Sequence, residues 1–319
     1  MWSTTSGAAK FGAFTVALVV LFGVMYGAGR AVGPIAAEPA ANDHNPAPAA
    51  GGHANHGGSG SAAPAGGDEH PPGGLQVSER GYTMQPVTAA HGQFAFRITG
   101  PDGKPVTRYD VAHDKRMHLI VVRRDLSGFR HVHPELGKDG TWRVASPLGA
   151  AGSYRAYADF KPAGSDALTL GVDVDVAGAF APKPLPAPAR TATVDGFTVT
   201  IEGELQPGRT SKLTLRVTRD GKPVTDLQPY LGAYGHLVAL RKGDLAYLHV
   251  HPDGEPGDGK TRPGPEITFY AEVPSAGSYR LYLDFRHGDT VRTAEFTVDA
   301  GGAGSGGHDA GGHGEGDHD

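Results

Sequence analysis

The sequence predicts an all-β protein with two tandem β-sandwich domains that follow an N-terminal transmembrane helix. Three observations support this prediction: one segment occurs twice, apolar and polar residues alternate inside each copy, and the sequence outside the copies is either uncharged or low in complexity. The chain has 319 residues, of which 49 are Gly and 25 are Pro, a share typical of sequences that are partly low in complexity. We therefore expect a disordered linker and a disordered tail beside the folded domains.

The N-terminal segment Phe11–Gly29 contains 19 residues and no charge. A helix needs about 20 apolar residues to cross a bilayer, whereas the apolar part of a signal peptide has about 7–15. We expect residues 1–33 to be a cytoplasmic stub and a retained transmembrane anchor rather than a cleaved signal. This predicts a single-pass protein of the cell membrane with its C-terminal domains on the extracytoplasmic side.

Two further segments are predicted to be disordered. Residues 34–74 form a linker rich in Pro, Ala, Gly and His, and residues 300–319 form a tail rich in His, Asp and Gly. Both have too few large apolar side chains to order themselves by burial. Their histidines are interpreted either as weak metal collectors or as parts of a solvated segment, and the sequence leaves both interpretations open.

The internal repeat defines the domains. The motif DGKPVT at 102–107 recurs at 220–225, and AGSYRAYADF at 151–160 recurs as AGSYRLYLDF at 276–285. Alternating stretches such as FAFRI, and turn signals such as PDGKP, are typical of short strands in a sandwich. The predicted domains are sandwich 1 at 75–177 and sandwich 2 at 190–299, joined by a Pro-rich linker at 178–189.

The first copy contains three histidines at a spacing that suggests a metal site. His131 and His133 are two residues apart, so they share one face of a strand. If the preceding hairpin is centred near residues 125–126, His118 lies opposite His133, and facing residues have Cβ atoms about 4.5–5.5 Å apart. The three imidazoles then converge, which predicts a three-histidine metal site in sandwich 1.

The second copy repeats the spacing with His236, His249 and His251, which predicts a second site. Imidazole nitrogens suit Cu(II) or Zn(II), and the chain has 0 Cys to select a softer metal. Asp159 and Asp284 occupy equivalent positions in the two copies, and we expect each to orient an imidazole. The alternative is that both carboxylates bond loop backbone and have only a structural role.

The string MHLIVVRRDLSGFRHVHPE, with AGSYRAYADF after it, resembles the secreted bacterial domains called YtkA-like or FixH-like, which are described as heavy-metal-binding. The resemblance covers residues 102–160 well and 220–285 more loosely, since the second copy lacks the Met of the first. It implies immunoglobulin-like sandwiches, membrane-anchored in the manner of actinobacterial examples. It also implies an envelope location and an association with a metal such as copper.

The remaining expectations concern function. The formal charge is −5, which argues against a nucleic-acid partner, and no motif for nucleophilic catalysis or phosphate binding is present, so we expect no enzyme. The predicted function is metal buffering, sensing or delivery, with the membrane, a metal ion and an envelope metal-handling protein as partners. The alternatives are a cell-surface stalk of immunoglobulin-like domains without a metal role and, less favoured, a redox enzyme at a copper site.

Overall fold

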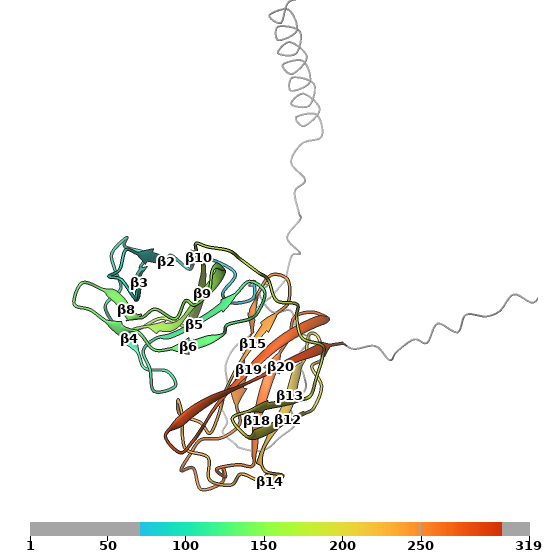
Figure 1. The fold of residues 1–319 in the computed structure, drawn as a ribbon. Coiled ribbons are helices and arrows are strands. Elements are labelled where there is room, and N and C mark those ends of the chain that lie inside the picture. Colours follow the sequence, from blue (N-terminus) through green and yellow to red (C-terminus); the bar gives the residue numbers. More distant parts are fainter. Residues whose placement is uncertain (1–70, 249, 302–319) are drawn as a thin grey trace, which may run out of the picture. The chain divides into compact units, whose positions relative to one another are not determined.

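The computed structural model describes residues 71–248 and 250–301 (Figure 1). These residues form strands, turns and loops, and none of their segments is a helix that could cross a membrane. The predicted anchor and nearly all of the predicted linker and tail lie outside the described residues. The described residues belong to one compact unit, which contains both copies of the repeat.

The first copy folds as a sandwich of two antiparallel sheets. Its strands are β1 (Ser78–Glu79), β2 (Tyr82–Val87), β3 (Gln93–Thr99), β4 (Tyr109–Asp110), β5 (His118–Arg123), β6 (Arg130–Val132), β7 (Glu135–Leu136), β8 (Thr141–Ala145), β9 (Gly152–Pro162) and β10 (Leu168–Val176). One sheet has the order β1-β2-β3-β8-β7, and the other has the order β10-β9-β5-β6, with β4 also paired to β9.

The second copy repeats this arrangement. Its strands are β11 (Thr191–Val194), β12 (Phe197–Glu202), β13 (Thr210–Arg219), β14 (Lys222–Pro223), β15 (His236–Arg241), β16 (Tyr247–Leu248), β17 (Val250–Pro252), β18 (Glu266–Glu272), β19 (Gly277–His287) and β20 (Thr290–Ala300). The sheets have the orders β11-β12-β13-β18-β17, with β14 on β13, and β16-β15-β19-β20. The prediction of two tandem all-β domains is therefore confirmed.

Each sandwich has its own core, which follows from the alternation of residues along its strands. In β3, Phe94, Phe96 and Ile98 are buried in the first core, and in β13, Leu213 and Leu215 are buried in the second. Side chains two residues apart point to the same face of a strand, so the apolar set of each strand faces the opposite sheet.

Each copy also contains a tyrosine corner. The hydroxyl of Tyr154 donates to the carbonyl of Ala150, and the hydroxyl of Tyr279 donates to the carbonyl of Ser275, both at 2.7 Å. Such a bond from a tyrosine to backbone a few residues upstream is a hallmark of immunoglobulin-like sandwiches. The two copies thus share this feature as well as the same strand order.

The register of the first hairpin matches the sequence prediction. In β5 and β6, Leu119 pairs with Val132 and Ile120 pairs with His131, which centres the hairpin between residues 125 and 126. Extended by one step, this register sets His118 opposite His133.

The second hairpin follows the same register only at first, because β16 pairs with β15 but β17 pairs with β18 of the other sheet. His251 therefore lies opposite Tyr270 of β18, although it lines the same cavity as His236.

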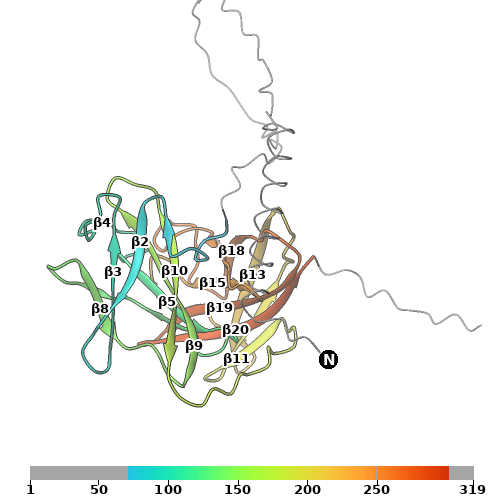
Figure 2. The same cartoon turned by 90° about the horizontal axis from the view of Figure 1, so that it is seen from above.

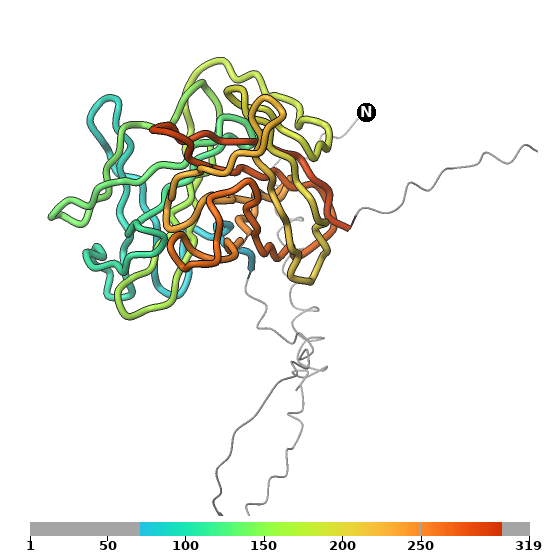
Figure 3. Tube along the Cα trace, turned by 90° about the horizontal axis from the view of Figure 1, so that it is seen from below, coloured from blue at the N-terminus to red at the C-terminus, as the bar shows by residue number. Residues whose placement is uncertain are grey.

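A third apolar cluster lies between the sandwiches. Along β5, Leu119 and Val121 are buried in the core of the first sandwich, whereas Ile120 and Val122 pack against residues of the second. Figures 1 and 2 show β5 and β9 of the first copy beside β15 and β19 of the second. Figure 3 draws the Cα trace of both copies from the side opposite to Figure 2. The shared cluster consists of Ile120, Val122, Leu126, Phe129, Tyr157, Val238, Leu240, Leu245 and Tyr282.

Two equivalent hydrogen bonds cross this cluster. The hydroxyl of Tyr157 donates to the carbonyl of Leu245 at 2.7 Å, and the hydroxyl of Tyr282 donates to the carbonyl of Leu126 at 2.6 Å. The accepting leucines occupy matching turns and have φ angles of 64° and 65°, which L residues other than Asn and Asp rarely adopt. The two sandwiches therefore contact each other through matching elements of the repeat.

The connecting segments also contact the sandwiches. Gly74 donates its amide to the carbonyl of Thr169, and the amide of Tyr247 donates to the carbonyl of Gly73, so the last residues of the predicted disordered linker are in place between strands of both copies. In the Pro-rich linker, the amide of Lys183 donates to Oδ2 of Asp125 at 2.9 Å. These bonds tie both linkers to the compact unit.

Candidate metal centre

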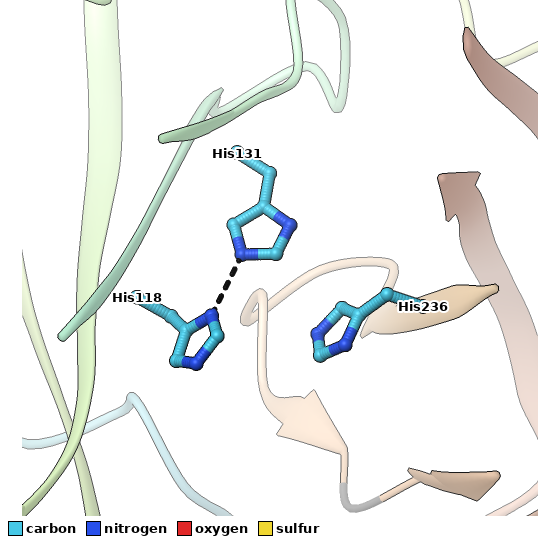
Figure 4. A group of neighbouring side chains, drawn as sticks. All are labelled: His118, His131 and His236. Carbon is cyan, nitrogen blue, oxygen red and sulfur yellow. Dashed lines mark hydrogen bonds between the residues drawn. The ribbon is translucent and has the colours of Figure 1, made fainter. Parts of the chain in front are cut away.

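His118 begins β5, and its side chain lies on the face that meets the second sandwich. The residue is only 3% exposed. Its Nε2 lies 3.0 Å from the carbonyl oxygen of Ala112, and its Nδ1 lies 3.1 Å from Nε2 of His131 (Figure 4). Both ring nitrogens are thus engaged, one by backbone and one by a second imidazole.

His131 in β6 connects the two sandwiches. Its Nδ1 lies 2.9 Å from Oδ2 of Asp284, a residue of β19 in the second copy. The side chains of His131 and Asp284 are 1% and 4% exposed. The other carboxylate oxygen of Asp284 accepts a hydrogen bond from the Thr293 hydroxyl at 2.6 Å. The carboxylate is therefore held in place from one side while it contacts the imidazole from the other.

His236, at the start of β15, supplies a third imidazole from the second sandwich. Its ring stacks on that of His118 with 5.6 Å between centroids and 2° between planes, and its centroid is 4.9 Å from that of His131. Each of the three residues offers a nitrogen that lies within 4.8 Å of the other two (Figure 4). The group therefore has the composition and spacing of a candidate metal centre.

The hydrogen bonds fix which nitrogens carry protons. The Ala112 carbonyl can only accept, so His118 carries its proton on Nε2 and leaves a lone pair on Nδ1. His131 must then donate from Nε2 to that lone pair, while its Nδ1 faces a carboxylate oxygen of Asp284.

A divalent metal can replace the proton between the two imidazoles. Zinc–nitrogen distances are about 2.0–2.1 Å, so two nitrogens of a tetrahedral site lie about 3.3 Å apart. The observed separation of 3.1 Å between Nδ1 of His118 and Nε2 of His131 is close to that value. Metal-bound histidines usually donate their other ring N–H to a carboxylate or a carbonyl, as Asp284 and Ala112 would accept here.

The surroundings favour neutral imidazoles. Burial, with the charge of His131 as the next cause, lowers the pKa of His118 to about 4. Burial followed by the charges of His131 and His118 lowers the pKa of His236 well below its ordinary value. Because a metal binds only the unprotonated nitrogen, such imidazoles are ready to bind a metal at neutral pH.

Two further histidines adjoin the three. The ring of His133 lies 5.1 Å from that of His118 and 4.9 Å from that of His131, and its buried Nε2 has no hydrogen-bond partner among the described residues. Burial, then the charges of these two neighbours, lowers the pKa of His133 to about 3. The ring of His113 lies 5.8 Å from that of His236. Sequence reasoning did not single out His113.

The structure groups the predicted ligands differently from the sequence analysis. His118 and His131 come together as expected, but the third nitrogen within reach belongs to His236 of the other sandwich, while His133 lies beside the group. His251 is exposed in β17. His249 lies outside the described residues. Among the described residues, the nitrogens that come within reach of one another therefore belong to both sandwiches, and a second site that includes His249 stays a prediction.

The two predicted carboxylates also have different surroundings. Asp284 contacts an imidazole, but that imidazole belongs to the opposite copy. Asp159 lies across from His118 in the register of β5 and β9, and it accepts a hydrogen bond from Thr169 at 3.1 Å. Burial raises the pKa of Asp159. The expected orienting contact is therefore present for Asp284, whereas Asp159 has a hydroxyl partner.

Comparisons with solved structures give only distant similarity. The chain is similar to a protein of Corynebacterium diphtheriae described as membrane-anchored, with 9% identity and a TM-score of 0.20 over 70% of this chain and 59% of that chain. It is also similar to the adhesin InvE of Yersinia pseudotuberculosis, with 12% identity and a TM-score of 0.20 over 70% and 60%. This chain spans less than two thirds of either protein, and similarity at this level carries no argument about function.

The sequence itself gives a clearer relationship. No curated protein matches the chain. One family, described as a domain of unknown function (DUF8832), matches residues 74–178 and again residues 192–302. The match identifies neither copy as a YtkA-like or FixH-like domain, and it says nothing about a metal. Because the two matches cover both repeats and more than half of the chain, the protein belongs to the DUF8832 family and contains two tandem copies of its domain.

Proposed function

We propose that this protein binds one divalent metal ion between its two sandwiches. The observation that carries the proposal is the group of His118, His131 and His236, whose nitrogens lie within 4.8 Å of one another. The Asp284 and Ala112 contacts support it, because each leaves one imidazole nitrogen of its partner directed at the shared centre.

The ligand chemistry favours Cu(II) or Zn(II). Three imidazole nitrogens suit these ions, and the chain has no thiolate that would select Cu(I) or an iron–sulfur cluster. Met117 precedes His118, but its side chain is buried in the core of the first sandwich and does not join the group. The preference for Cu(II) or Zn(II) therefore rests on the imidazole nitrogens alone.

The role we propose is metal buffering, sensing or delivery outside the cytoplasm. The uncharged segment Phe11–Gly29 would hold the protein in the membrane, and the sandwiches would face the envelope. A site shared by two domains couples metal binding to their contact, since both must be in place to supply all three nitrogens. This coupling suits a protein that has to take up and release its ion.

The experiment is metal uptake by the full chain. We expect native protein and His91→Ala, an exposed histidine of the first sandwich, to bind equal amounts of Zn(II) in equilibrium dialysis. The His131→Ala variant should bind about one equivalent less, while the linker and tail histidines contribute equally to all three samples. Equal uptake by His131→Ala and native protein would contradict the proposal and favour the stalk without a metal role.

A further inference from the structure

A cavity of about 250 Å³ adjoins the candidate metal centre on one side. His118 and His236 both form part of its wall, whereas His131 does not. This volume exceeds the share of several water molecules, each of which occupies about 30 Å³ in the liquid. The cavity thus reaches two of the three proposed ligands and has room for a small molecule beside them.

Positive charge predominates around this cavity. Lys115, Arg116 and Lys161 line it, and the first two are exposed. Lys161 pairs with Asp110 at 3.5 Å, whereas Lys115 and Arg116 stand at the cavity wall with no ion pair to another described residue. The carboxylate of Asp159 lies in the same wall and is engaged by Thr169. The lining therefore favours an anion over a cation.

A bound divalent metal ion would add positive charge that an anion could compensate. Three neutral imidazoles leave both charges of a divalent ion uncompensated, and Asp284 is the carboxylate that contacts a proposed ligand among the described residues. Burying an uncompensated charge is costly, and a bound ion is often the largest charge in its surroundings. Structural zinc sites have four protein ligands, whereas three protein ligands leave a position for an exogenous one.

From these contacts we propose that the metal keeps an open coordination position toward the cavity, and that a small monovalent anion binds there. This inference rests on the proposed function and adds the chemical class of its second ligand. Lys115 and Arg116 attract the anion, and His118 and His236 present the metal to it. The anion replaces a water molecule on the metal, so no bond of the protein is made or broken. A metal with an exchangeable ligand is also more easily passed to another protein.

The test uses the full chain loaded with Cu(II), with azide as the probe. Azide bound to Cu(II) produces a charge-transfer absorbance that is absent when the two are apart, and we expect a saturable increase of this band. The Lys115→Ala, Arg116→Ala double variant should raise the azide dissociation constant by roughly threefold to tenfold, since each exposed charge contributes modestly. The control Lys104→Ala, an exposed lysine outside the cavity, should match native protein.

Three outcomes separate the two proposals. If native protein takes up one Cu(II) more than His131→Ala but shows no azide band, the site is closed and the inference is overturned while the proposed function stands. If azide binds only after His133→Ala, then His133 fills the fourth position, and the inference is again wrong. If native protein and His131→Ala take up equal Cu(II), the proposed function itself fails.

Discussion

Nδ1 of His131 in the first sandwich lies 2.9 Å from Oδ2 of Asp284 in the second. The two residues are 153 positions apart in the chain, and both side chains are almost completely buried. This contact leaves Nε2 of His131 directed at His118, where the proposed metal would bind. The carboxylate of one copy thus orients an imidazole of the other.

Replacing this carboxylate should weaken metal binding without removing a ligand. We expect Asp284→Asn to lower Zn(II) affinity about 10- to 100-fold, because the amide cannot hold the Nδ1 proton of His131 as a carboxylate does. Affinity is measured by competition with a coloured chelator. The matched control is Asp159→Asn at the equivalent position, whose carboxylate bonds Thr169 instead. An equal loss in both variants would contradict the role given to Asp284.

The contact between the sandwiches should depend on the two tyrosine hydroxyls. Tyr157→Phe and Tyr282→Phe each remove a buried hydrogen bond to a leucine carbonyl in the opposite copy. We expect each change to lower the free energy of unfolding by about 1–3 kcal/mol, the cost of a buried acceptor left without its donor.

Urea unfolding of metal-free protein measures this loss. Tyr270→Phe, at an exposed position of β18, should leave the free energy of unfolding within about 0.5 kcal/mol of native. If Tyr157→Phe and Tyr282→Phe were as stable as this control, the crossed hydrogen bonds would not stabilise the assembled pair.

Stability of the metal-free protein should fall in acid. An unfolded histidine takes up its proton near pH 6.5, but burial lowers the pKa of His118 to about 4 in the folded protein. Between these values the unfolded state binds more protons, so the free energy of unfolding decreases as the pH falls from about 6.5 to about 4. At about 1.4 kcal/mol per pKa unit, His118 contributes at most about 3 kcal/mol to this decrease.

The measurement is a series of urea unfolding curves between pH 7.5 and pH 4 in the presence of a chelator, with about half a pH unit between curves. The decrease should be smaller in His118→Gln, which has no imidazole to protonate at this position. In His91→Gln, an exposed site, it should match native protein. A stability that stays constant or rises toward pH 4 would contradict this account.

The fold was predictable because its signals are local. Alternation with a period of two identifies the strands, and the position of the turn at 124–128 sets the register of Leu119 with Val132. The strand change between β16 and β17 was not predictable, because equal spacing in two copies does not determine which sheet a strand joins. That change pairs His251 with Tyr270 of β18 in the second copy.

The shared centre was missed for a related reason. The histidines were expected to meet within one hairpin, but Ile120 and Val122 lie on the same face of β5 as His118. Apolar residues on that face indicate that it is buried against something outside its own core, and all six residues of β5 are indeed buried. The uninterrupted apolar run in HLIVVR indicated that both faces of this strand are buried, but it did not identify the second sandwich as the covering element.

We propose that both sandwiches hold the same metal ion. Counting the equivalents of tightly bound Zn(II) in full-length native protein, His118→Ala, His236→Ala and the double variant tests this most directly. A shared site predicts that each single variant loses about one equivalent and that the double variant loses no more than either alone. A loss of one equivalent in each single variant and of two in the double variant would show separate sites and contradict the claim.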